Sequence, residues 1–221
     1  MNSNSSTTSA ILWSVVSASL CAFAVAPCFL EADHWGDDLV RFSVRLALFY
    51  YGIAACLMLT LRSQEWSPLA RRGQITRRFW TAAYMAYLIH LAMAFHYYHH
   101  WSHADAVDHT REVSGIGEGI YVSHLFTLLW GADVVFWLAS PNGYARRRPW
   151  IGWVLHAFMV FIIFNGTVVY ETGFIRWAGI ALLSILGILW VKKTPYFCLG
   201  PVSKKSLHGA GAGSQPDLDS D

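Results

Sequence analysis

Long runs of apolar residues separated by short polar stretches form the hydrophobic pattern of this chain. Each run extends over about 20 residues, the length of helix that spans a hydrocarbon core about 30 Å thick. We predict six such segments, at residues 10–30, 39–61, 79–98, 119–139, 150–170 and 175–191. Helices are expected because every backbone N–H and C=O group in lipid needs a partner within its own segment. The pattern predicts an all-α fold, a polytopic membrane protein built as a bundle of six transmembrane helices.

Polar residues mark both ends of this membrane domain, which we place at residues 10–193. A short polar N-terminus, residues 1–9, precedes it. The stretch 194–221 is rich in Gly, Ala and Ser, a composition that cannot build a packed core. We therefore predict a disordered tail there.

The basic residues predict how the helices are oriented. They gather in alternate connections, after the second, fourth and sixth segments: Arg62, Arg71, Arg72, Arg77 and Arg78, then Arg146, Arg147 and Arg148, then Lys192, Lys193, Lys204 and Lys205. Connections rich in Lys and Arg stay on the cytoplasmic side of a membrane. Both termini and the tail are therefore expected in the cytoplasm. We expect a multi-pass protein of the cell membrane, with the bacterial inner membrane as the favoured location.

The composition agrees with a bilayer as the first partner and argues against nucleic acid. Only 14% of the residues are charged, against about 25% in soluble domains. A net charge of +2, with no basic aromatic groove, excludes nucleic acid as a partner. The four cysteines show no paired spacing, so we predict neither a disulfide framework nor a cysteine metal site.

Seven of the ten histidines lie between residues 90 and 124. If the third helix continues beyond the membrane, histidines spaced i, i+3, i+4 and i+7 share one of its faces. Imidazole is a ligand of Zn, Cu and Fe alike, and nearby carboxylates would complete a shell. The candidate metal ligands are His99, His100, His103, His109 and Glu118. A solvated histidine cluster without metal is the alternative that the sequence leaves open.

His96 and His124 form a second candidate site. Counted from the inner ends of the third and fourth helices, the two histidines reach the same depth, near the outer third of the membrane. Two imidazoles on neighbouring helices suit the axial positions of one b-type haem. The predicted cofactor is therefore haem b or a transition metal (Fe, Cu or Zn).

Three ionisable residues, His90, Asp133 and His156, are predicted inside the membrane. Such residues are rare there and face the bundle interior or a cavity. His156 and Asp133 come out at the same depth and would pair. The alternative for Asp133 is a hydrogen bond to a Trp, a Tyr or the backbone.

Arg41 and Arg45 stand one helical turn apart at the outer end of the second segment. Their side chains are expected to extend to the lipid headgroups and to pair with Asp37 or Asp38. Binding of an anionic group, such as a haem propionate or a substrate carboxylate, is the alternative.

Two stretches resemble known groups of proteins. His96-Tyr-Tyr-His99-His100 resembles the HxxHH box of membrane fatty-acid desaturases and hydroxylases, a resemblance that implies two iron ions held by several such boxes. A second HxxHH box is absent from this sequence, and the charge pattern places this one outside rather than in the cytoplasm. Residues 100–106 and 164–179 resemble a group of bacterial six-span membrane proteins, which implies a fold and no activity.

The leading hypothesis is a redox or electron-transfer membrane protein with an outward-facing haem or metal site, linked to quinone or to other membrane subunits. The alternatives are a transporter of metal ions or protons, and a membrane subunit without chemistry. No P-loop, nucleophile elbow, HExxH or CxxCH motif is present, so the sequence does not establish whether the protein is an enzyme.

Overall fold

The computed structural model describes residues 35–193. The predicted first span, 10–30, and the predicted tail, 194–221, lie outside the described residues. Within the described part the secondary structure is entirely helical, which confirms the all-α fold class there. The elements are α2 (Trp35–Thr60), η2 (Ser63–Trp66), α3 (Arg71–Tyr97), α4 (His103–Ser114), α5 (Gly119–Ala139), α6 (Pro141–Arg146), α7 (Pro149–Phe164), the π-helical η3 (Asn165–Val169) and α8 (Gly173–Lys193).

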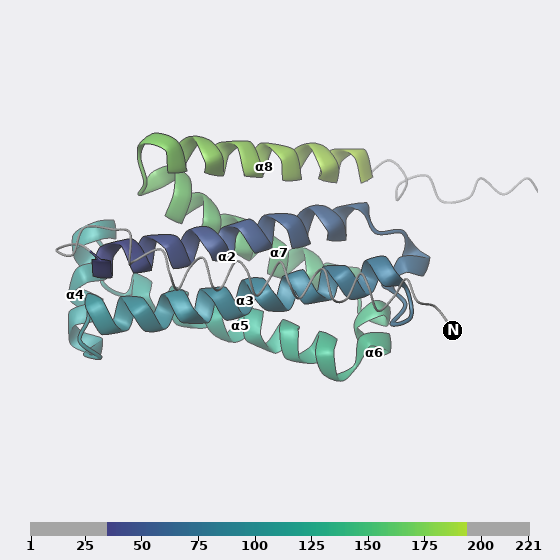
Figure 1. The fold of residues 1–221 in the computed structure, drawn as a ribbon, viewed down its shortest axis with the longest axis horizontal. Coiled ribbons are helices and arrows are strands. Elements are labelled where there is room, and N and C mark those ends of the chain that lie inside the picture. The colour runs from purple at the N-terminus through teal and green to yellow at the C-terminus, as the bar shows by residue number, and fades with distance from the viewer. Residues whose placement is uncertain (1–34, 194–221) are drawn as a thin grey trace, which may run out of the picture.

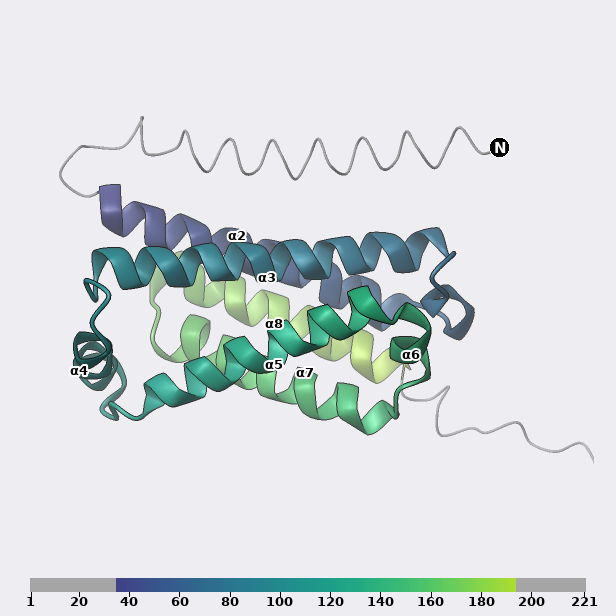
Figure 2. The same ribbon diagram turned by 90° about the horizontal axis from the view of Figure 1, so that it is seen from below.

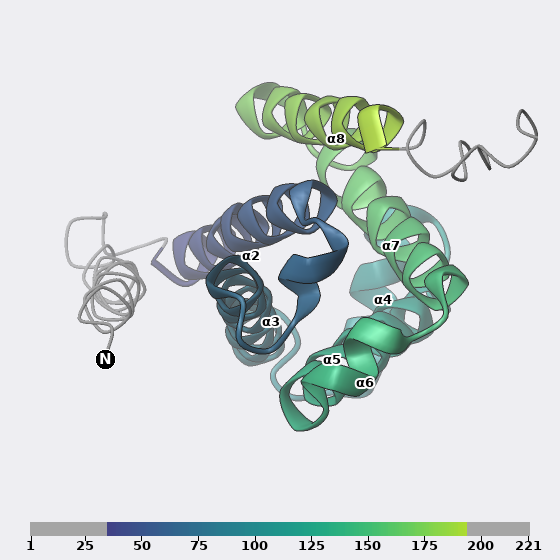
Figure 3. The same ribbon diagram turned by 90° about the vertical axis from the view of Figure 1, so that its right-hand side faces the viewer.

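The long helices of the described part pack as a closed ring. α2 and α3 lie antiparallel along their lengths (Figure 1), α3 packs on α5, α5 on α7, α7 on α8, and α8 returns to α2. Figure 3, a view along the bundle, shows this arrangement. The short helix α4 lies across one end of the bundle and α6 lies at the opposite end (Figure 2). We call these the α4 end and the α6 end.

Large aromatic side chains fill the interior of the ring. The indole of Trp80 is fully buried and contacts the rings of Tyr51 and Trp130 at centroid distances of 5.9 and 5.4 Å. Trp130 in turn contacts Tyr87 and Phe126 at 5.5 and 5.4 Å. Aromatic side chains bury about 150–250 Å² each, and tilted pairs such as these add to that stabilisation. The three elements α2, α3 and α5 are therefore joined through one aromatic cluster.

Four helices of the described part are long and apolar enough to cross a membrane. They cover Gly36–Thr60, Gly119–Ala139, Pro149–Val169 and Gly173–Lys193. Most of their side chains face outward, away from the protein interior, as expected for surfaces in contact with lipid. The third of these spans, Pro149–Val169, ends in the π-helical turn η3, where the N–H of Tyr170 donates to the carbonyl of Asn165, five residues back, at 3.0 Å, before α8 begins.

α3, which contains the predicted third span, is not among the four, because its sequence carries polar side chains. Those side chains bond to other helices. The hydroxyl of Tyr87 lies 2.8 Å from Oγ1 of Thr127, and the hydroxyl of Tyr84 donates to the carbonyl of Thr127 at 3.3 Å. His90 Nδ1 lies 3.1 Å from the carbonyl oxygen of Val40 in α2. These polar groups of α3 thus form hydrogen bonds to neighbouring helices, as polar side chains between membrane helices do.

Gly73, in the first turn of α3, is packed directly against the backbone of η2. A Cβ atom at this position would overlap the carbonyl oxygen of Glu65, and a backbone atom cannot move aside as a flexible side chain can. Gly73→Ala is therefore expected to lower the free energy of unfolding by about 1–3 kcal/mol. The check is the melting temperature of the detergent-purified protein, with Gly187→Ala as the matched control. A Cβ at Gly187 meets nothing within 4 Å, so equal effects of the two substitutions would contradict the prediction.

Candidate functional site

The turn between α3 and α4 decides where the histidines lie. α3 ends at Tyr97, so the four-histidine face expected from a continued helix is not formed. His100 and Trp101 have left-handed backbone conformations, with φ of 47° and 62°. Such conformations are strained for residues with large side chains, and such strain is often found at functional sites. The N–H of Trp101 donates to the carbonyl of Phe95 at 2.9 Å, which folds the turn back onto α3.

His103 and His124 face each other at the α4 end. Ser102 caps α4 by accepting a hydrogen bond from the N–H of Asp105 at 3.2 Å, which places His103 at the first residue of the helix. The His103 ring lies 5.6 Å from that of His124, with the two planes at 90°. Tyr121, one turn earlier on α5, lies 5.9 Å from His103. α4 and α5 together therefore present a pair of imidazoles.

The tautomer of His124 is set by its own helix. Its Nδ1 lies 2.7 Å from the carbonyl oxygen of Ile120, so Nδ1 carries the hydrogen and donates it. In the neutral ring this leaves Nε2 as the nitrogen whose lone pair can bind a metal ion. This is the tautomer that a second-shell carbonyl fixes in protein metal sites.

His99 and His109 form a second pair, at 5.2 Å and 61°. The ring of Tyr98 stacks on His109 at 5.7 Å, with the planes 12° apart. His99 is buried, with 7% of its surface exposed, and its Nδ1 has no hydrogen-bond partner. Burial lowers the pKa of His99, and the neighbouring His109 lowers it further. Both effects favour the neutral form of His99, which is the form that binds a metal ion.

The remaining candidates at this end, like His103, His109 and His124, are solvent-exposed. His96 accepts a hydrogen bond at Nδ1 from Trp101 Nε1 at 3.4 Å, and His100 and Glu118 are exposed as well. The rings in contact with His124 are those of His103 and Tyr121, so the haem site at His96 and His124 stays a prediction. Among residues 35–193, no three His, Cys, Asp or Glu side chains are grouped to hold one metal ion. The site is therefore described best as pairs of imidazoles.

Asp133 lies near the α6 end, and its carboxylate has three side-chain partners. Trp80 Nε1 and the Tyr144 hydroxyl both donate to its Oδ2 at 3.0 Å, and Arg147 pairs with its Oδ1. Only 5% of the Asp133 side chain and 12% of the Arg147 side chain are exposed. The guanidinium of Arg147 also lies 3.8 Å above the Tyr144 ring. The alternative predicted for Asp133, a hydrogen bond to a Trp or a Tyr, is confirmed. Its ion pair with Arg147 was not predicted from the sequence.

The two histidines predicted inside the membrane, His90 and His156, contact other helices. The ring of His156 lies 5.6 Å from that of Trp80, so Trp80 contacts both His156 and Asp133. His90 bonds to α2 through Val40, and Ser43 Oγ lies 3.3 Å from the same ring nitrogen. These contacts support a role for the deep polar residues in joining helices.

Residues 35–193 therefore define the class: a helical membrane protein with four helices long and apolar enough to span, paired imidazoles at one end and a buried ion pair near the other. Comparison of the chain with models of protein families, with curated proteins and with solved structures found no match.

Proposed function

We propose that this protein binds a transition-metal ion, such as Zn²⁺ or Cu²⁺, at its α4 end through His103 and His124. The observation that carries the proposal is the facing pair of rings, with Nε2 of His124 left free by the bond from Nδ1 to Ile120. Zn–N bonds are about 2.0–2.1 Å, so two imidazoles on one tetrahedral ion have ring centroids roughly 5 Å apart. The centroids of His103 and His124, 5.6 Å apart, lie close to that separation.

Two imidazoles leave coordination positions open to water or to a second molecule. Structural zinc sites instead fill all four positions with protein ligands. A site with only two protein ligands therefore suits an ion that is captured and passed on, or one that acts on a bound substrate. The neighbouring pair, His99 and His109, supplies two further imidazoles at the same end.

The proposed topology has six spans, with both termini in the cytoplasm and the α4 end outside, in the cell membrane of a bacterium. The arrangement of charge supports it. The arginines that precede and begin α3, those that follow α6 and the lysines that end α8 all lie at the α6 end (Figure 1). That end would be cytoplasmic by the distribution of Lys and Arg. In this topology α3 is a span, antiparallel to α2.

Metal titration of the full-length protein tests the proposal. After chelation of residual metal, Zn²⁺ affinity is measured calorimetrically in detergent. His103→Ala with His124→Ala is expected to weaken binding at least tenfold, because both first ligands are lost. The matched control is His100→Ala, since His100 is exposed on the adjacent turn. Unchanged affinity in the double variant, with an unchanged melting temperature, would reject the proposed site.

A visible spectrum of the same samples separates the metal from the haem hypothesis. The metal-ion proposal expects no Soret band. A Soret band that disappears when His96 and His124 are both replaced would instead support a haem site and an electron-transfer role.

A further inference from the structure

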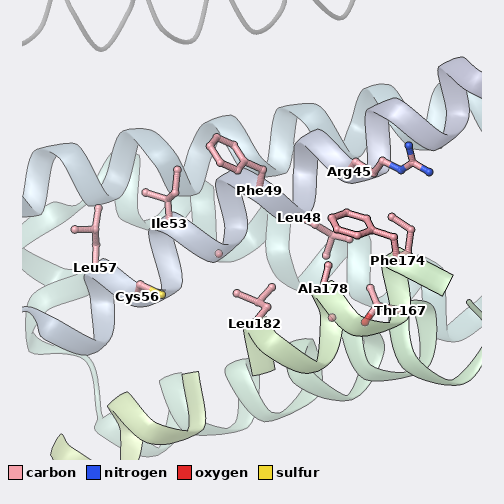
Figure 4. Close-up of a pocket in the computed structure, with 13 residues that line it drawn as sticks. Arg45, Leu48, Phe49, Ile53, Cys56, Leu57, Thr167, Phe174, Ala178 and Leu182 are labelled. Carbon is pink, nitrogen blue, oxygen red and sulfur yellow. The ribbon is translucent and has the colours of Figure 1, made fainter. Parts of the chain in front are cut away.

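An apolar groove of about 660 Å³ runs between α2 and α8 (Figure 4). Ligand pockets commonly have volumes of about 300–1,000 Å³, so the groove is large enough for a ligand or part of one. Its walls are almost entirely apolar: Leu48, Phe49 and Ile53 come from α2, and Phe174, Ala178 and Leu182 come from α8. It is separate from the histidine pairs and from the Asp133 cluster, which share none of its lining residues.

Two glycines bring the walls of the groove together. A Cβ at Gly52 would lie 3.0 Å from Leu182, so α2 and α8 approach closely there. A Cβ at Gly179 would overlap the hydroxyl of Thr167, which the π-helical turn η3 places against α8. The hydroxyl of Thr167 donates to the carbonyl of Ile163 at 2.7 Å. Thr167 therefore has no hydrogen left to donate to a ligand in the groove.

Arg45 is the one charged residue of the lining. Its guanidinium lies 5.6 Å from the ring of Phe42, its side chain is exposed, and within residues 35–193 it forms no ion pair with a carboxylate. It lies within two turns of residue 39, the predicted outer end of the span, from where an arginine reaches the headgroups. Guanidinium and phosphate form strong, charge-assisted hydrogen bonds.

We propose that the groove binds one acyl chain of an anionic phospholipid whose phosphate contacts Arg45. The apolar walls accommodate the chain, and the cation at the outer end selects the headgroup. A zwitterionic lipid fits the same walls but carries a cation of its own beside the phosphate. Anionic headgroups are therefore bound in preference to zwitterionic ones.

Native mass spectrometry of the full-length protein in mild detergent tests the selection. With phosphatidylglycerol and phosphatidylcholine added in equal amounts, we expect at least a fivefold excess of the phosphatidylglycerol adduct. Arg45→Gln is expected to abolish this excess, whereas Arg111→Gln, at an exposed position on α4, is expected to keep it. Equal binding of the two lipids by the parent protein would overturn the proposal.

Photolabelling tests the position of the chain. Phosphatidylglycerol with a diazirine in its acyl chain is expected to label peptides covering residues 46–57 and 174–182. Labelling spread evenly over all lipid-facing helices would overturn the groove assignment. If native mass spectrometry gave the mass of a dimer and neither segment were labelled, a second copy of the chain would cover the groove. That result would also overturn the proposal.

Discussion

Asp133→Ala is expected to lower the free energy of unfolding by about 3–5 kcal/mol, the usual cost of removing one partner from a buried ion pair. The substitution leaves the largely buried guanidinium of Arg147 without its carboxylate. It also leaves Trp80 Nε1 and the Tyr144 hydroxyl without their shared acceptor, and unpaired buried donors carry their own penalty. The melting temperature of the detergent-purified protein is the measurement, and a fall of roughly 6–20 °C is expected.

A double variant distinguishes the lost charge balance from a general loss of packing. Combining Asp133→Leu with Arg147→Met removes both charges, and neutral pairs of similar volume often replace buried ion pairs without loss of stability. The double variant is therefore expected to regain much of the lost melting temperature. A double variant as unstable as Asp133→Ala would show that the ion pair is not the cause.

The ion pair between Asp108 and Arg111 on α4 provides the matched control. Its partners are 2.6 Å apart, with 67% and 55% of their side chains exposed. Exposed pairs contribute little to stability because water and salt screen them. Asp108→Ala is therefore expected to leave the melting temperature unchanged.

The helical segments were predictable because a long apolar run in lipid has few ways to satisfy its backbone. The segment predicted at residues 119–139 has the same bounds as α5, and the segment predicted at 175–191 falls inside α8. α3 shows how such a prediction depends on tertiary structure. Its apolar run contains Tyr84, Tyr87 and His90, polar residues that become compatible with a bundle only through partners on α2 and α5.

The geometry of the histidines was less predictable, because it depends on a turn without a clear sequence signal. His100 and Trp101 adopt left-handed conformations, which are uncommon for residues other than glycine. Nothing local in the sequence predicts the end of α3 at this point. Ser102 followed by Asp105 is a helix-capping pattern, and it marks the start of α4 where the structure has it. This pattern indicates that His103 begins a new helix and does not continue α3.

The partner of Asp133 depends on a chain reversal. Arg147 is 14 residues away in the sequence, and the short helix α6 returns the chain so that the guanidinium meets the carboxylate. The sequence did contain a hint, because a carboxylate inside a membrane needs a compensating group and the run of three arginines at 146–148 is close by. Which of the three arginines turns inward is decided by the fold alone.

Trp80→Ala is the second substitution with a large expected effect. Trp80 is fully buried, contacts Tyr51, Trp130 and His156, and donates to Asp133. Replacing a buried Trp by Ala costs about 3–5 kcal/mol, the sum of lost burial and of the cavity left behind. We expect a fall in melting temperature similar to that of Asp133→Ala, measured in the same detergent. Trp177→Ala, at a Trp with 68% of its surface exposed, is the matched control and is expected to have little effect.

Trp80→Phe separates the two contributions of this side chain. Phenylalanine keeps much of the aromatic packing but cannot donate to Asp133, so we expect a loss of about 1–3 kcal/mol, intermediate between the parent and Trp80→Ala. Because Trp80 and Asp133 share a hydrogen bond, the effects of Trp80→Phe and Asp133→Asn are expected to be non-additive in a double-mutant cycle. Strict additivity would mean that the two residues stabilise the protein independently. The bond between α3 and α5 would then contribute nothing of its own to the stability of the ring.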